Sequence, residues 1–171
     1  METRRQQKAS LSTAAFFAMA ANPIKLKLYL LKNLPAAYFS GLKVVQANPQ
    51  ECIVSVPYTW FTKNPFRSTY FACLSMGAEL STGILAMAAI YGQKQSVSML
   101  VTGMESQFYK KAKGTVLFHC PDGEKIASAI EAAIGTGTGQ EVKIQSKGKN
   151  DTGELIAEFL FTWSFKVKGT R

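Results

Sequence analysis

The least polar segment of the chain carries one acidic side chain. Glu79 is the only charged residue between Tyr70 and Gly92, in a run that is otherwise apolar, small or hydroxylic. In a buried helix an unpaired carboxylate is unfavourable, and desolvation raises its pKa. Such a carboxylate suits general-base catalysis. On a helix face that reaches solvent, or paired with a lysine, the same side chain has only a structural role, and its position on one helix does not decide between these readings.

The segment is also long enough to cross a membrane, since about 20 apolar residues span the hydrocarbon core. Ser75, Glu79 and Thr82 oppose that reading, because an acid near the centre of a span costs a few kcal/mol. A helix buried by a surrounding sheet explains the apolar character equally well. Gly77 and Gly83, which weaken a helix by about 1 kcal/mol each, then indicate close packing. We therefore expect a buried helix and no membrane span.

The segments before this helix predict one helix and one hairpin. Ile24, Leu28 and Leu31 recur at helical spacing between Pro23 and Pro35 and predict a helix that buries this apolar face. Two β-rich runs, 41–46 and 51–60, then flank the turn "ANPQ". The second run alternates apolar and polar side chains, and its Pro57 is expected at a sheet edge or a bulge.

The segments after the helix predict four strands and one helix. Val97–Thr102 and Thr115–Cys120 read as strands, and 122–135 reads as a helix with Asp122 as its N-cap and Gly135 as its stop. A hairpin turns around residues 149–153, and its second strand alternates over 155–167. With every strand connection read as a hairpin or a helix-bearing crossing, this order predicts an α+β fold in which an antiparallel sheet wraps one buried helix.

The length of 171 residues predicts a single domain, 1–171, in which 1–21 form an N-terminal extension. Basic residues followed by an apolar run over 11–20 resemble a secretory signal, but a short amphipathic helix has the same pattern. Cys52, Cys73 and Cys120 lie in apolar runs without metal-ligand spacing, and the chain has one histidine. We therefore expect no metal site, no cofactor and a reducing compartment, the cytoplasm.

The net charge of +9 predicts an anionic partner. Nucleic acid, a membrane surface and a small ligand with several phosphates, such as coenzyme A, all fit this charge. Lys110, Lys111 and Lys113 form a cluster that either meets phosphates or is a solvated surface. No nucleic-acid recognition motif accompanies the charge, so we expect no nucleic-acid partner.

The stretch "NPFRSTYFACLSMGAEL" resembles the helix-entry motif of the hotdog-fold acyl-CoA thioesterases, in particular the PaaI-like branch and a bacterial subfamily of it. In that motif an Asn lies six residues before a His-Gly-Gly turn, and an acidic residue follows nine after the His. Asn64, Tyr70 and Glu79 have this spacing. The runs "VPYTW" and "FYKKAKGTV", and the order of strands and helices from about 22 to 168, extend the resemblance.

The resemblance implies a curved sheet around a long central helix, and an acyl-CoA or related thioester substrate between the subunits of a homodimer or a tetramer. Glu79 is then general base or nucleophile, and Asn64 orients water or substrate. The amides of Phe71 and Ala72 polarise the thioester carbonyl at the positive end of the helix. Thr82 is expected to hydrogen-bond substrate or carboxylate.

The positively charged side chains of Arg67, Lys111 and Lys113 are candidate phosphate contacts in this reading. Tyr70, Phe71 and Ala72 depart from the family pattern, because they replace His-Gly-Gly and leave a substrate less room at the start of the helix. In the place of the motif's His, Tyr70 is either a catalytic residue that donates through its hydroxyl or a buried ring that plugs the helix entrance. This departure keeps open a second function on the same scaffold, that of a non-catalytic acyl-CoA or lipid-binding protein.

Overall fold

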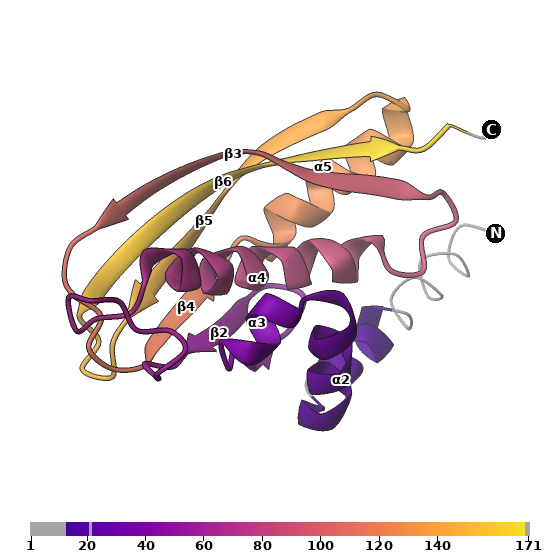
Figure 1. Cartoon of the computed structure of the whole chain (residues 1–171). Helices are drawn as coiled ribbons and strands as arrows, with labels where there is room; N and C mark the ends of the chain where they lie inside the picture. Colours follow the sequence, from indigo (N-terminus) through magenta and orange to yellow (C-terminus); the bar gives the residue numbers. More distant parts are fainter. Residues whose placement is uncertain (1–12, 21, 170–171) are drawn as a thin grey trace.

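The computed structural model describes residues 13–20 and 22–169, and its core is a curved six-stranded antiparallel sheet that wraps one long helix (Figure 1). Residues 13–20 are helical. The elements that follow are α2 (Pro23–Asn33), α3 (Pro35–Phe39), β1 (Lys43–Ala47), β2 (Cys52–Val56), α4 (Phe71–Ile90), β3 (Val97–Phe108), β4 (Val116–Cys120), α5 (Gly123–Thr136), β5 (Gln140–Lys149) and β6 (Leu155–Val167). The α+β architecture and the central helix predicted from the sequence are confirmed.

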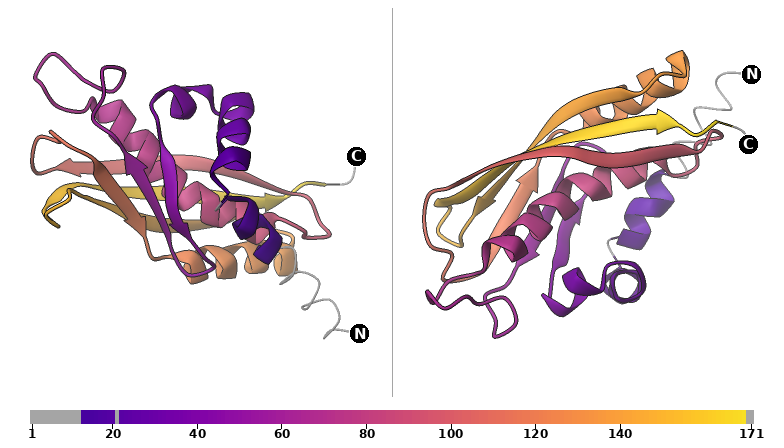
Figure 2. Two further views of the ribbon diagram at one scale, coloured as in Figure 1. Left: turned by 90° about the horizontal axis from the view of Figure 1, so that it is seen from below. Right: turned by 45° about the horizontal axis from the view of Figure 1, so that its top comes forward.

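The strand order is β1-β2-β4-β5-β6-β3, and α4 runs along the concave face of the sheet (Figures 1 and 2). The alternation predicted for the last strand holds, since the side chains of Phe159, Phe161, Trp163 and Phe165 are buried in β6. β3 pairs only with β6 and so forms one edge of the sheet.

Burial by the sheet accounts for the apolar character of α4. The helix is long and apolar enough to cross a membrane, but 67% of its most apolar 18-residue stretch is buried inside the protein. Gly77 allows the closest approach to the sheet, because a Cβ atom there would lie 2.2 Å from Cγ2 of Val56. The close packing expected at this glycine is therefore present.

The connection between β3 and β4 corrects the predicted topology. It is neither a hairpin nor a helix-bearing crossing, because β3 pairs with β6 while β4 lies between β2 and β5. β3 also runs to Phe108, six residues beyond the predicted end at Thr102. A bulge between Val101 and Gly103 shifts the register at this point, which interrupts the alternation in the sequence.

Two predicted boundaries differ for local reasons. β2 ends at Val56, so Tyr58 and Trp60 are outside the strand and Pro57 follows the strand instead of lying at its edge or in a bulge. The helix α5 continues past Gly135 and ends at Thr136, and its C-cap Gly137 has a left-handed φ of 69°.

Asp122 is at the N-cap position of α5 as expected, but its side chain does not cap the helix. One carboxylate oxygen accepts the backbone N–H of Gln145 in β5 at 3.0 Å, and the other pairs with Lys125 at 2.8 Å. The side chain therefore fastens the start of α5 to the sheet.

The helix α2 buries a different face from the one predicted. Ile24, Leu28 and Leu31 point outward, while Leu26 and Leu30 are buried. This helix has apolar residues on two faces, so its periodicity alone could not identify the buried one. Pro35 ends α2 as expected and also begins α3, where its missing N–H is tolerated.

Candidate functional site

The loop before α4 is organised by Asn64. Its Oδ1 accepts the backbone amides of Phe66 at 3.0 Å and Ser68 at 3.2 Å, and its Nδ2 lies 3.4 Å from the carbonyl oxygen of Thr69. Arg67, within this turn, has a left-handed φ of 57°. The Asn64 side chain, expected to orient water or substrate, is therefore engaged in shaping the loop.

The start of α4 leaves two backbone donors unpaired. Tyr70 is extended, with φ −62° and ψ 133°, and its carbonyl accepts the amides of Cys73 at 2.9 Å and Leu74 at 3.3 Å. The amides of Phe71 and Ala72 have no hydrogen-bond partner among the described residues. They are unpaired donors at the positive end of a 20-residue helix, where a developing negative charge is stabilised.

A cavity of ≈ 560 Å³ opens at this helix start. Its lining combines the loop, the first turn of α4, the end of β3 and the segment that follows β3: Asn64, Pro65, Phe66, Ser68, Thr69, Tyr70, Phe71, Leu74, Phe108, Tyr109, Lys110, Lys111 and Ala112. Five of the residues singled out in the sequence thus meet here: Asn64, Tyr70, Phe71, Lys110 and Lys111. Phe108 and Tyr109 were not anticipated, because the strand that carries Phe108 was predicted to end too early.

Aromatic rings form much of the cavity wall. The Tyr70 and Phe71 rings make an edge contact at 4.9 Å between centroids, and the Phe71 and Phe108 rings make another at 6.3 Å. Both Tyr70 and Phe71 are about half exposed. Aromatic rings therefore line the cavity entrance at the positions where the similar helix-entry motif has a small His-Gly-Gly turn.

The basic residues divide between the cavity and the outer surface. Lys110 and Lys111 line the cavity, and Lys110 forms an ion pair with Glu154. Lys113 and Arg67 are exposed and do not line it. Of the three candidate phosphate contacts, only Lys111 lies at the cavity.

Glu79 lines a separate pocket of ≈ 220 Å³ between α3 and α4. Burial raises the pKa of its carboxyl group. No described residue donates a hydrogen bond to this carboxylate, and Gly83, one turn later, provides the room for it, since a Cβ there would lie 3.2 Å from Oε1. The other lining residues are Asn33, Leu34, Pro35, Ala36, Ala37, Met76 and Leu80.

Thr82 has different partners from those expected. Its side chain is fully buried, its hydroxyl accepts the indole N–H of Trp163 at 2.9 Å, and it donates to the backbone carbonyl of Glu79 at 2.9 Å. The hydroxyl thus joins α4 to β6 and does not contact the Glu79 carboxylate.

Phe71 and Glu79 lie on one face of α4 but are far apart along it. Phe71, Ser75 and Glu79 follow at intervals of four residues, and all three side chains reach solvent. Eight residues of α-helix separate Phe71 from Glu79, which is about 12 Å along the axis. A small group bound at the amides of one chain is therefore out of reach of that chain's own Glu79.

The family model described as "Domain of unknown function (DUF4442)" matches residues 28–165. The chain belongs to the DUF4442 family. No curated protein sequence matches this DUF4442 protein.

Solved structures of bacterial proteins resemble this DUF4442 protein along most of their length. A Pseudomonas aeruginosa protein described as a probable thioesterase is 23% identical, with a TM-score of 0.71, over 86% of this chain and 97% of its own. A putative thioesterase from Shewanella oneidensis is 14% identical, with a TM-score of 0.67, over 84% and 96%. The PaaI protein of the E. coli phenylacetic acid degradation operon is 12% identical, with a TM-score of 0.58, over 84% and 91%. At these identities the comparison shows the fold, which is the hotdog fold.

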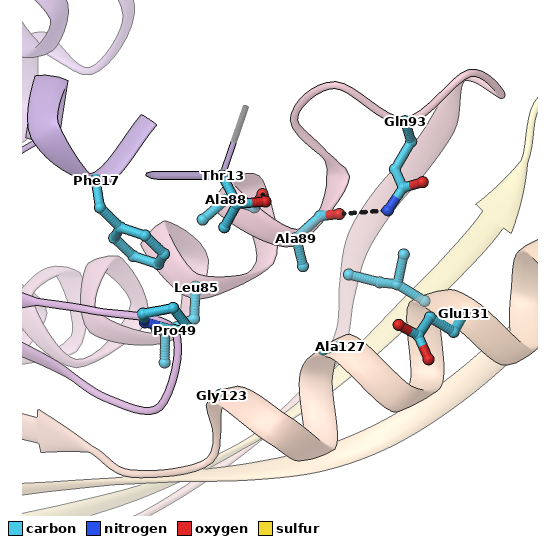
Figure 3. A pocket seen from close by; sticks show the side chains of 11 residues that line it. Thr13, Phe17, Pro49, Leu85, Ala88, Ala89, Gln93, Gly123, Ala127 and Glu131 are labelled. Carbon is cyan, nitrogen blue, oxygen red and sulfur yellow. Dashed lines mark hydrogen bonds between the residues drawn. The ribbon is translucent and has the colours of Figure 1, made fainter. Parts of the chain in front are cut away.

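A third cavity, of ≈ 330 Å³, lies at the other end of α4 and contains none of the predicted site residues. Figure 3 shows Phe17 and Leu85 on one side of it and Ala127 and Glu131 of α5 on the other. The Gln93 side chain donates to the carbonyl of Ala89 at 3.0 Å. Among the described residues of this DUF4442 protein, no group of three or more His, Cys, Asp or Glu side chains could hold a metal ion.

Proposed function

We propose that this DUF4442 protein hydrolyses thioesters of the acyl-CoA class. The proposal rests on the unpaired amides of Phe71 and Ala72 at the start of α4, where Phe71 lines a largely apolar cavity of ≈ 560 Å³. Such a cavity suits an acyl group, and the amides suit the oxygen of its carbonyl. The thioesterase descriptions of the Pseudomonas and Shewanella structures support the same reaction class.

In the proposed reaction, Glu79 removes a proton from water as the water oxygen attacks the thioester carbonyl carbon. The resulting oxyanion is stabilised by the N–H groups of Phe71 and Ala72. The C–S bond then breaks, the proton passes from Glu79 to the thiolate, and an acid and a thiol leave. The raised pKa of Glu79, caused by its burial, makes it a stronger base than an exposed glutamate.

In this proposal, the Glu79 that acts at the amides of one chain belongs to a second copy of the chain. The free edge of β3, with Leu100 and Met104 exposed, is available for antiparallel pairing with the same strand of another copy. A two-fold axis across that edge reverses the direction of α4. Because Ser75 lies midway between Phe71 and Glu79, a partner helix crossing at Ser75 brings its own Glu79 to the amide of Phe71.

The proposed substrate is held at its other end by charge. Lys111 lies at the cavity. Lys113 and Arg67 are exposed, and each is next in sequence to a residue that lines the cavity. We assign them to the phosphates of coenzyme A or of a phosphopantetheine-carrying protein, which share the same chemistry.

A panel of short, long and aromatic acyl-CoA thioesters tests the reaction. Wild-type protein is expected to hydrolyse part of the panel, and Glu79→Gln is expected to reduce turnover by roughly 100-fold or more, since general-base catalysis contributes about 100- to 10,000-fold. Glu124→Gln, at an exposed acid of α5, is the matched control and leaves turnover unchanged. Unchanged hydrolysis by Glu79→Gln would exclude this role of Glu79.

Mixed dimers test whether two chains share one site. Tyr70 already has the extended conformation that precedes a proline, so Phe71→Pro removes one amide N–H with the helix intact. Phe71→Ala removes the ring but keeps the N–H. Glu79→Gln and Phe71→Pro, each inactive alone, are expected to regain activity when co-expressed, because the mixed dimer has one complete site. No recovery of activity in verified mixed dimers would mean that Glu79 of one chain and the Phe71 amide of the other do not act in one site.

A second candidate function, binding of an acyl-CoA or lipid without catalysis, is favoured by one observation. The half-exposed rings of Tyr70 and Phe71 stand at the amides, where the related motif has glycines. This function predicts saturable binding of a non-hydrolysable acyl-CoA analogue together with no turnover of any thioester in the panel.

A further inference from the structure

The outward face of α2 is apolar. Ile24, Leu28 and Leu31 are 71%, 63% and 45% exposed, and their spacing of four and three residues aligns them in one stripe along the helix. We propose that this stripe, with the lysines beside it, docks the protein onto an anionic phospholipid bilayer. Figure 1 shows α2 at the side of the molecule away from β3 and β6.

The body of the protein holds α2 with the stripe outward. Leu26 and Leu30 are buried on the opposite side, and the Tyr29 hydroxyl donates to Sδ of Met87 in α4 at 3.3 Å. The Asn22 side chain caps the first turn by accepting the amides of Ile24 and Lys25. The apolar stripe is therefore displayed on a fixed helix and not on a frayed end.

Lysines flank the stripe on both sides. At 100° per residue, Lys27 lies on one side of it, and Lys25 and Lys32 lie on the other. All three are exposed, and none forms an ion pair with a described residue. The surrounding sequence has the same sign, because every one of the seven charged residues between positions 3 and 50 is Lys or Arg. An apolar helix face bordered by lysines is the pattern of helices that lie in the interface of an anionic membrane.

Exposed aromatic side chains extend the surface beyond α2. The ring centroids of Phe39, at the end of α3, and Phe61 are 6.3 Å apart. Trp60, next to Phe61 in sequence, is 79% exposed. Figure 1 and the right view of Figure 2 place α2, α3 and the segment before α4 along the same side of the molecule. Aromatic rings of this kind gather at the headgroup level of membranes.

The combination of residues favours a bilayer over other occupants. A second copy docked through a two-fold axis on this stripe would bring Lys25, Lys27 and Lys32 against their own counterparts, and like charges in contact oppose association. A nucleic acid would pair with the lysines but would leave the apolar stripe in water. An anionic bilayer neutralises the lysines and buries the stripe in one step. This proposal does not depend on thioester hydrolysis.

Vesicle sedimentation tests the docking. The full chain is expected to sediment with vesicles that mix phosphatidylcholine and phosphatidylglycerol, and to bind far less to phosphatidylcholine alone. Replacing Lys25, Lys27 and Lys32 by Gln is expected to weaken binding roughly 100-fold, since each lysine near such a surface contributes about fivefold. The matched control removes three other exposed lysines, Lys94, Lys166 and Lys168, and is expected to change binding less than about tenfold.

A second variant isolates the apolar part of the surface. Replacing Ile24, Leu28 and Leu31 by Gln preserves helix propensity and all charges, and is expected to weaken vesicle binding at least about tenfold with an unchanged far-ultraviolet circular dichroism spectrum. Wild-type protein that fails to bind the anionic vesicles would overturn the proposal. Unaltered vesicle binding together with a lower molar mass in this variant would overturn it in favour of a contact between copies.

Discussion

The two halves of α4 have different surroundings. From Leu80 to Ala86 every residue is buried by the sheet and by neighbouring elements, whereas Phe71, Ser75 and Glu79 reach solvent in the first half. One helix thus combines an anchored half, which fixes its position, with an open half, which presents amides and a carboxylate. The difference teaches that overall apolarity does not show where on a helix the functional groups lie.

The largest expected effect comes from the anchored half. Ile84 is 1% exposed, and Ile84→Ala is expected to lower the free energy of unfolding by about 2–4 kcal/mol, because it leaves a cavity under the sheet. Urea denaturation measures this change. Met76→Ala, in the open half, is the matched control and is expected to cost less than about 1 kcal/mol. Equal losses for both variants would remove the distinction between the halves.

Two glycines show that close contact with the sheet is not confined to the anchored half. A Cβ at Gly77 would lie 2.2 Å from the Val56 side chain, so Gly77→Ala is expected to lower the free energy of unfolding by about 1–3 kcal/mol. At Gly83 the nearest atom to an added Cβ is a carboxylate oxygen, at the far end of the Glu79 side chain, at 3.2 Å. Gly83→Ala is therefore expected to keep or raise stability by up to about 1 kcal/mol, through helix propensity.

Gly83→Ala is also expected to reduce thioester hydrolysis, because it displaces the Glu79 carboxylate. Urea denaturation and acyl-CoA turnover, measured on both glycine variants, separate the two effects. A stable Gly77→Ala protein, or an unstable Gly83→Ala protein, would contradict the packing described for these positions.

A hydrogen bond within the anchored half gives a smaller effect. Thr82→Val leaves the buried indole N–H of Trp163 without its acceptor and is expected to lower the free energy of unfolding by about 1–2 kcal/mol. Thr82→Ser retains a hydroxyl and is expected to recover most of this loss. Thermal or urea unfolding of the three proteins measures it, and equal losses in Val and Ser variants would assign the effect to packing alone.

The sequence was sufficient for the architecture of this fold because its strongest patterns are local. The alternation in β6 and the continuous apolar run of α4 identify a sheet that wraps a helix. The face of α2 was misassigned, since Leu26 and Leu30 compete with Ile24, Leu28 and Leu31 and only tertiary contacts decide between them. The pairing of β3 with β6 is equally non-local.

The candidate site was predictable only in part, for a geometric reason. The spacing of Asn64, Tyr70 and Glu79 identified α4 as the helix that carries the site. Asn64 and Tyr70 line the cavity at its start. Sequence spacing does not indicate that Glu79 lies in another pocket, about 12 Å along the helix, or that the Thr82 hydroxyl is engaged by Trp163. Both facts depend on which side of α4 the sheet covers.

The smallest expected effect concerns the charge of Glu79. Because burial raises the pKa of this carboxyl group in the folded protein, the folded state holds the proton more tightly than the unfolded state. Stability associated with the protonated group is therefore complete below the unfolded pKa and is lost as the pH rises through the folded pKa. Gln cannot ionise, so Glu79→Gln is expected to be more stable than wild type at neutral pH.

The difference in stability between Glu79→Gln and wild type is expected to shrink as the pH falls below the ordinary pKa of glutamate, about 4.3. Urea midpoints of both proteins over a series of pH values measure it, with Glu124→Gln as the control for loss of an exposed charge. A stabilisation that instead grew at low pH would mean that the ionised carboxylate has a favourable partner in the fold. In that case the open half of α4 would hold Glu79 as a structural ion, and its readiness to accept a proton from water would be lost.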